Sequence, residues 1–185
     1  MPAIPKDLKA ALLNMPSAKK DKLLLQLLAP NQLLQDQLRF ELLEGGEEGL
    51  EARRTLLEQQ ITQLTQSFYY TAQELLTALR QFCPAIGYHQ KVTQDLYGEV
   101  NLWLLLVNGV LEHQQETLQA LSGANEALVL FLTKRADEAL QKLRKLHPDL
   151  HLEFAEHLHL MLTRLHASAT GYAARKAGLP AGWDG

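Results

Sequence analysis

The sequence lacks the cysteine pairs that cross-link small secreted proteins and the long apolar segments that span a membrane. Its 185 residues contain one cysteine, Cys83, which excludes an internal disulfide framework and favours a reducing compartment. The longest apolar run, residues 102–107, is far shorter than the ~20 residues that span a bilayer. Residues 1–13 lack the basic segment and apolar core of a secretory signal. We therefore expect a cytoplasmic protein without membrane association.

The sequence also lacks an excess of charge of either sign. Eighteen Lys and Arg residues against 21 Asp and Glu residues give a formal net charge of −3, so the chain has no overall basic character that would favour nucleic acid. Hydrophobic residues make up 46% and charged residues 21%, as in ordinary globular proteins. No internal repeat has the period of a helical solenoid. A chain of this length is expected to form one domain with its own core.

What the sequence does contain is helical periodicity. Apolar residues recur at spacings of three and four from Leu8 to Leu165, which is the pattern of amphipathic helices. It predicts an all-α fold, with three short helices before four longer ones, in an irregular antiparallel bundle or a short stack of helical hairpins. Prolines and glycines divide the pattern into seven expected helices, at residues 5–14, 17–28, 31–44, 47–82, 92–121, 124–147 and 148–170.

This layout predicts a single helical domain over residues 1–170. Its N-terminal part, residues 1–45, contains the short helices, and residues 47–170 contain the long ones. The glycine- and proline-containing C-terminus, residues 171–185, is expected to be a mobile tail. The leucine-rich run at 23–28 is expected to be buried in the core.

The two central helices are expected to form the spine of the bundle. The run 67–71 is poor in helix-forming residues, yet the apolar stripe keeps its phase across it, so we expect a continuous helix over 47–82. Residues 83–87 are expected to form a loop. The middle of the next helix is apolar on all faces, which indicates that it is either buried or part of an interface. The helices at 124–147 and 148–170 are expected to pair as an antiparallel hairpin against this spine.

The C-terminal histidines are the one feature that suggests metal chemistry. His147 and His151 stand four residues apart, which can place two imidazoles on one metal ion. Glu156 and His159 form a Glu-x-x-His step, half of the signature of di-iron carboxylate bundles. On an ideal helix, however, Glu156 and His159 lie opposite the apolar stripe, so we expect them to face solvent. His147 and His151 remain the metal-site candidates, although the pattern favours solvated or half-buried structural histidines over a metal site.

Other reactive residues lack a supporting context. Cys83 would lie at the C-terminus of a helix, where the helix dipole does not favour a thiolate. The helix at 31–44 could resemble a DNA recognition helix, but it offers only Arg39 against Asp36, Glu41 and Glu44. We therefore identify no catalytic residue and no cofactor motif.

Four further stretches of sequence are distinctive: PKDL at 5–8, FELL at 40–43, EVNLWL at 99–104 and KLRKLHPDL at 142–150. In these stretches the chain resembles an uncharacterised family of all-helical cytoplasmic bacterial proteins of similar length. All four are helix-packing patterns rather than reactive groups. The resemblance implies an architecture, and it implies no activity, because the family has none assigned.

The sequence thus favours a non-enzymatic helical interaction or structural protein. Leu152 and Leu160 lie away from the main stripe of their helix, and together with the apolar helix at 92–121 they suggest a homo-oligomer or a helical protein partner. A metal-binding protein or metal-dependent enzyme that uses the C-terminal histidines is the first alternative. A nucleic-acid-binding regulator is the second.

Overall fold

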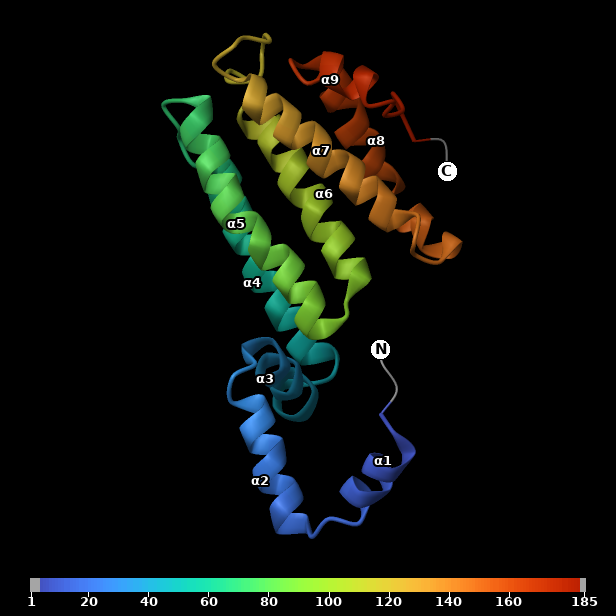
Figure 1. The fold of residues 1–185 in the computed structure, drawn as a ribbon. Coiled ribbons are helices and arrows are strands. Elements are labelled where there is room, and N and C mark those ends of the chain that lie inside the picture. The colour runs from blue at the N-terminus through green and yellow to red at the C-terminus, as the bar shows by residue number, and fades with distance from the viewer. Residues whose placement is uncertain (1–3, 184–185) are drawn as a thin grey trace.

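The computed structural model describes residues 4–183, and these residues form α-helices and connecting segments without a β-strand. The all-α prediction is therefore confirmed. The helices divide into a bundle, α4 to α9, and a projecting arm, α1 to α3 with a short π-helix η1 (Figure 1). The helices span α1 Lys6–Leu13, α2 Ser17–Leu28, α3 Gln32–Arg39, η1 Phe40–Glu44, α4 Glu47–Gln66, α5 Ala72–Thr93, α6 Leu96–His113, α7 Glu126–Leu143, α8 His151–Ala167 and α9 Gly171–Lys176, with a 3₁₀ turn η2 at Pro148–Leu150.

The prediction of one continuous helix over 47–82 is wrong. Helix α4 ends before Ser67, whose backbone is extended, and α5 begins after Thr71. The Thr71 side chain accepts a hydrogen bond from the Glu74 N–H at 3.1 Å, and the Glu74 carboxylate accepts one from the Tyr70 N–H at 3.0 Å. This arrangement, related to a capping box, satisfies the free N–H groups at a new helix start.

The loop predicted at 83–87 is also incorrect, because α5 runs through Pro84 to Thr93. Pro84 is exposed, so its ring projects outward while the opposite face of α5 packs in the core. The helix ends at Gln94, which adopts a left-handed conformation with φ 60°. Asp95 then caps α6, which starts later and ends earlier than the predicted 92–121.

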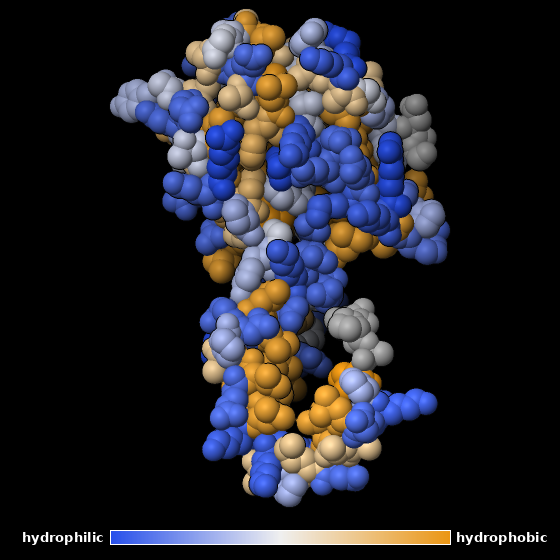
Figure 2. Space-filling view, in the orientation of Figure 1, coloured by the Kyte–Doolittle hydropathy of each residue, from blue (hydrophilic) through white to orange (hydrophobic). Residues whose placement is uncertain are grey.

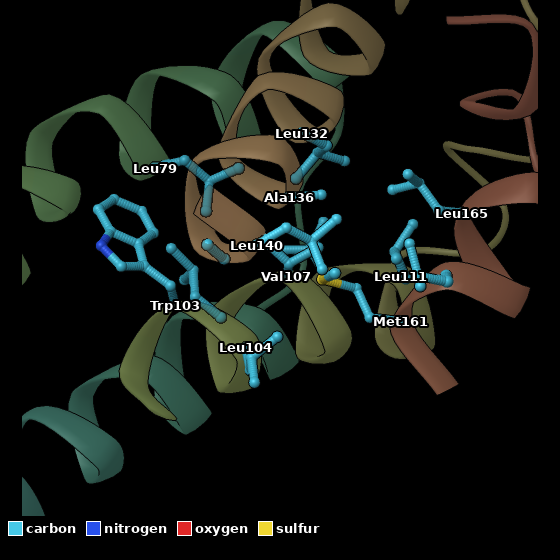
Figure 3. Close-up of a cluster of buried hydrophobic side chains, with 14 of the residues drawn as sticks. Leu79, Trp103, Leu104, Val107, Leu111, Leu132, Ala136, Leu140, Met161 and Leu165 are labelled. Atoms are coloured by element: carbon cyan, nitrogen blue, oxygen red, sulfur yellow. The ribbon is translucent and has the colours of Figure 1, made fainter. Parts of the chain in front are cut away.

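Helix α6 lies at the centre of the bundle and packs against α4, α5, α7 and α8. Its residues Leu102, Trp103, Leu104 and Leu106 are at most 4% exposed. The middle of α6 is therefore apolar on all faces because it is buried within the bundle. Figure 3 shows side chains of α5, α6, α7 and α8 meeting in this core. Helices α7 and α8 each pack mainly on α6 and less on each other, so they do not form the simple hairpin that we expected.

The segment expected to form a C-terminal tail contains α9. The Ala169 N–H just before it donates to the Leu118 carbonyl at 2.8 Å, and Leu179 just after it is only 7% exposed. Residues 171–179 are thereby packed on the bundle. None of the described helices is both long and apolar enough to cross a lipid bilayer.

Candidate functional site

A buried polar cluster joins α4, α5 and α6 at the start of α6. Asp95 caps this helix by accepting a hydrogen bond from the Gly98 N–H at 2.8 Å. Arg54 on α4 donates two further bonds to the same carboxylate, from Nε at 2.6 Å and from a terminal nitrogen at 2.7 Å. His89 on α5 lies with Nε2 3.3 Å from Asp95 Oδ2. The bidentate geometry is the one that makes Arg–carboxylate pairs strong and directional.

We call Asp95, Arg54 and His89 the Asp95 clamp, because their hydrogen bonds join three helices at one carboxylate. Burial raises the pKa of Asp95, but hydrogen bonds from His89, Arg54 and the Gly98 N–H outweigh that effect and hold its pKa well below the ordinary range. A carboxylate that is so weakly basic is poorly suited to act as a general base. Its oxygens are also already occupied by protein donors. The geometry therefore supports a structural role for Asp95 rather than proton transfer.

Two more polar contacts extend this clamp to the rest of the bundle. Glu99, 3% exposed, accepts a hydrogen bond from Lys142 Nζ of α7 at 2.5 Å. Tyr97 Oη donates to Glu153 Oε2 of α8 at 2.8 Å. The first turn of α6 is thus tied to all four neighbouring helices.

A groove of about 310 Å³ lies between α4, α6 and α8. Asn108 lines it and donates from Nδ2 to the His157 carbonyl at 3.0 Å, while its buried Oδ1 has no partner. Arg164 pairs with Glu112 across the rim at 3.0 Å. The groove offers hydrogen-bonding groups, but the described residues place no nucleophile–base pair in it.

The structure does not assemble the predicted histidines into a ligand set. The His147 side chain is 72% exposed, with Nδ1 3.4 Å from an Asp149 carboxylate oxygen. His151 begins α8 and stands edge-on to Trp183, with ring centroids 6.3 Å apart. Across residues 4–183 there is no group of three or more His, Cys, Asp or Glu side chains close enough to hold a metal ion. Glu156 and His159 are exposed, as helical phase predicts.

Cys83 lies in the middle of α5 rather than at a helix end. It is 8% exposed, and burial raises the pKa of its thiol to about 11. A thiol with this pKa is almost entirely protonated at neutral pH and is a poor nucleophile.

The arm, residues 4–44, carries the most extensive exposed apolar surface. The prediction that the run 23–28 is buried is wrong, because helices α1, α2 and α3 contain no buried residue. In this run Leu23 and Leu28 are half-buried and the other three leucines are exposed. Figure 2 shows hydrophobic surface along α1 and α2. The large side chains that are at least half exposed in the arm are Ile4, Leu8, Leu13, Leu24, Leu25, Leu27, Leu42 and Leu43, with exposed fractions of 50% to 80%.

The main contacts of the arm with the bundle, among the described residues, are made by α3 and η1. Gln37 donates to the Lys91 carbonyl at 2.7 Å, and Arg53 pairs with Glu44 at 2.6 Å. On the N-terminal side of α3, α2 leads away from the bundle, and α1 is joined to the far end of α2 by a turn (Figure 1). No other helix packs substantially on α1; a single hydrogen bond from Lys20 Nζ to the Leu13 carbonyl, 2.7 Å long, links it to α2.

Helices α1 and α2 have 8 and 12 residues, and isolated helices shorter than ~12–15 residues are marginal in water. Most helical stability in proteins comes from packing an amphipathic face. The leucines of α1 and α2 supply such a face, but no element of the described chain covers it. The exposed face of the arm is therefore the candidate functional surface.

Comparison with known proteins adds no relative, since no family model, curated protein or solved structure matches the chain.

Proposed function

We propose that this chain is a non-enzymatic helical interaction protein, in which the bundle holds the arm and the arm binds a protein partner. The observation that carries the proposal is the exposure of Leu24, Leu25 and Leu27, at 54%, 66% and 61%, on a helix that nothing between residues 4 and 183 covers on this face. Contiguous exposed apolar surface of this kind is typical of interaction sites.

The energetics favour the arm over the surfaces expected from sequence. The central helix α6 has one exposed large apolar side chain, Leu105, at 36%, and α8 exposes Leu152 and Leu160 at 77% and 37%. In contrast, the arm offers eight large side chains. Full burial of one such side chain contributes roughly 1.5–3 kcal/mol, so the arm as a whole can offset an association cost of about 4–15 kcal/mol.

Site-specific photo-crosslinking in the cell that makes the protein tests this proposal. A photoreactive amino acid replaces Leu25 or Leu43 of the arm, and Leu152 of α8 serves as the matched exposed control. We expect discrete protein adducts from the two arm positions and not from position 152. Absence of adducts at both arm positions, or equal labelling at all three, would contradict the proposal.

A second variant separates binding from folding. Replacing Leu24, Leu25 and Leu27 together with glutamine removes apolar surface that the bundle does not use. We expect the variant to keep the helix content and the cooperative thermal unfolding of the bundle, and to lose the adduct formed from position 43. Retention of that adduct would place the binding surface elsewhere.

A further inference from the structure

The free end of the arm is basic as well as apolar. Between residues 4 and 30 the chain has five lysines, Lys6, Lys9, Lys19, Lys20 and Lys22, against two aspartates, Asp7 and Asp21, which gives a net charge of +3. The whole chain carries −3, so the remainder carries −6. The surface that covers the arm should therefore combine apolar side chains with negative charge.

Helix α4 presents a surface of this kind at the end of the bundle that carries the arm. Glu47, Glu48 and Glu51 are exposed there together with Ala52 and Leu56, and they line one open face with Thr55 and Gln59. Leu56 is 55% exposed. The positions recur at helical spacing, so they form a single stripe along α4. This acidic face has three carboxylates beside an exposed leucine, complementary in charge and hydropathy to α1 and α2.

We infer that the partner of the arm is a second copy of this chain, an inference that rests on the proposed function. In the dimer, α1 and α2 of each copy pack on the acidic face of α4 of the other. One chain carries both complementary surfaces, so a single two-fold axis satisfies both at once, as a closed isologous interface requires. Within one chain, α2 leads away from the bundle (Figure 1), which leaves the acidic face of α4 open to another molecule.

The available area is sufficient for a stable dimer. Six large side chains of residues 4–27 are at least half exposed, and at roughly 100 Å² each they supply about 600 Å² of apolar surface. The acidic face of the same subunit adds to this area. Together they approach the ~800 Å² per partner that a standard interface buries.

Charge reversal followed by mixing tests the second copy. Sedimentation velocity at low salt measures the wild type, an arm variant, Lys19→Glu/Lys20→Glu/Lys22→Glu, and a face variant, Glu47→Lys/Glu48→Lys/Glu51→Lys. We expect a wild-type dimer, and each variant alone should dissociate with a dimer Kd raised by ~100-fold, since like charges then meet. An equimolar mixture of the two variants should form a heterodimer, because each arm then faces a surface of opposite charge.

A control variant, Lys134→Glu/Lys145→Glu/Lys176→Glu, changes the net charge by the same amount as the arm variant, at exposed positions of the bundle. It should remain dimeric with less than a ~3-fold change in Kd. Recovery of the dimer in the mixture also shows that both variants are folded, because misfolded chains would not restore each other.

Three results would refute the proposed dimer, and they differ in whether they also refute the proposed function. A monomeric wild type whose arm still crosslinks a different protein would refute the dimer and keep the interaction function. A monomer whose arm yields no adduct but binds vesicles of anionic phospholipid would refute both, and would assign the arm to a membrane surface. A dimer that both variants retain would place the interface away from the arm.

Discussion

Replacing Asp95 with asparagine tests whether the ionic contacts at the start of α6 hold the bundle together. Asparagine has nearly the same shape and is as good an N-cap as aspartate, so it can still accept the hydrogen bond from the Gly98 N–H. What it removes is the charge that faces Arg54 and the strong hydrogen bonds that this charge supports. The substitution therefore separates the ion pair from helix capping.

The structure sets the expected magnitude. The Asp95 side chain is 6% exposed and the Arg54 side chain 20%, so the pair is mostly desolvated. Removing one member of a buried pair lowers the free energy of unfolding by ~3–5 kcal/mol, chiefly because the other charge is left unpaired. Arg54 retains some contact with water, which places the expected loss near the lower limit, at about 3 kcal/mol.

Urea unfolding followed by far-ultraviolet circular dichroism measures this loss, and Glu112→Gln is the control. Glu112 pairs with the Arg164 guanidinium at 3.0 Å but its side chain is 49% exposed, so its removal should lower the unfolding free energy by less than ~1 kcal/mol. If Asp95→Asn costs no more than the control, the clamp does not stabilise the bundle.

The penalty should also depend on pH with a definite sign. The pKa of Asp95 is held below its ordinary value in the folded chain, against ~3.9 in the unfolded chain. Its stabilising contribution is therefore complete above about pH 4 and is lost as the pH falls toward the folded pKa. The difference in unfolding free energy between wild type and Asp95→Asn should be constant from neutral pH down to about 5 and shrink below 4. A difference that grows in acid would refute the assigned role.

Two further predictions concern packing. A Cβ at Gly109 of α6 would meet Thr65 Oγ1 of α4 at 2.8 Å, whereas one at Gly87 of α5 would meet nothing within 4 Å. We therefore expect Gly109→Ala to lower the unfolding free energy by ~1–3 kcal/mol and Gly87→Ala to raise it by ~0.5–1 kcal/mol. Equal effects of the two substitutions in urea titrations would contradict the close approach of α4 and α6. Cys83, whose pKa is raised to about 11 by burial, should react with a thiol reagent at mildly alkaline pH much more slowly in the folded chain than in urea, and similar rates in both conditions would mean that the residue is accessible.

The helical class is readable from the sequence because apolar residues keep one period over most of the chain, but the same period conceals the break between α4 and α5. The apolar stripe continues in phase through residues 67–71, yet Phe68 within it is 77% exposed. Periodicity reports which face is apolar, whereas the helix start at Thr71 depends on local hydrogen bonds to its side chain. The stretch Thr71-x-x-Glu74 is the signal that would have located it.

At Pro84 the sequence predicts a helix break that the structure does not contain. A proline inside a helix removes one backbone hydrogen bond and costs ~3 kcal/mol, which is why its position predicts a loop. In α5, residues on the other face, including Leu79, Cys83 and Ile86, are at most 8% exposed. Packing of this face offsets the local cost, and such tertiary effects are not visible in a local pattern.

The exposed apolar face of the arm is not predicted from the sequence, because a leucine-rich run is expected to be buried in the core. The run at residues 23–28 correctly predicts an amphipathic helix, α2, but amphipathicity specifies only that an apolar face needs a cover. It does not specify whether that cover belongs to the same chain. The buried clamp was also missed, because Arg54, His89 and Asp95 come from three helices and only Asp95, ahead of an apolar run, has a local signature as a helix cap.

The contrast between bundle and arm has a thermodynamic consequence. In the bundle, buried leucines and the clamp around Asp95 stabilise each helix through contacts within one chain. Helices α1 and α2 have no comparable cover, and short helices of their length are marginal on their own. Any partner that binds their ordered form stabilises it by mass action. The helix content of the arm should therefore rise with the concentration of its partner, while that of the bundle stays constant, and association through the arm is coupled to the order of the arm itself.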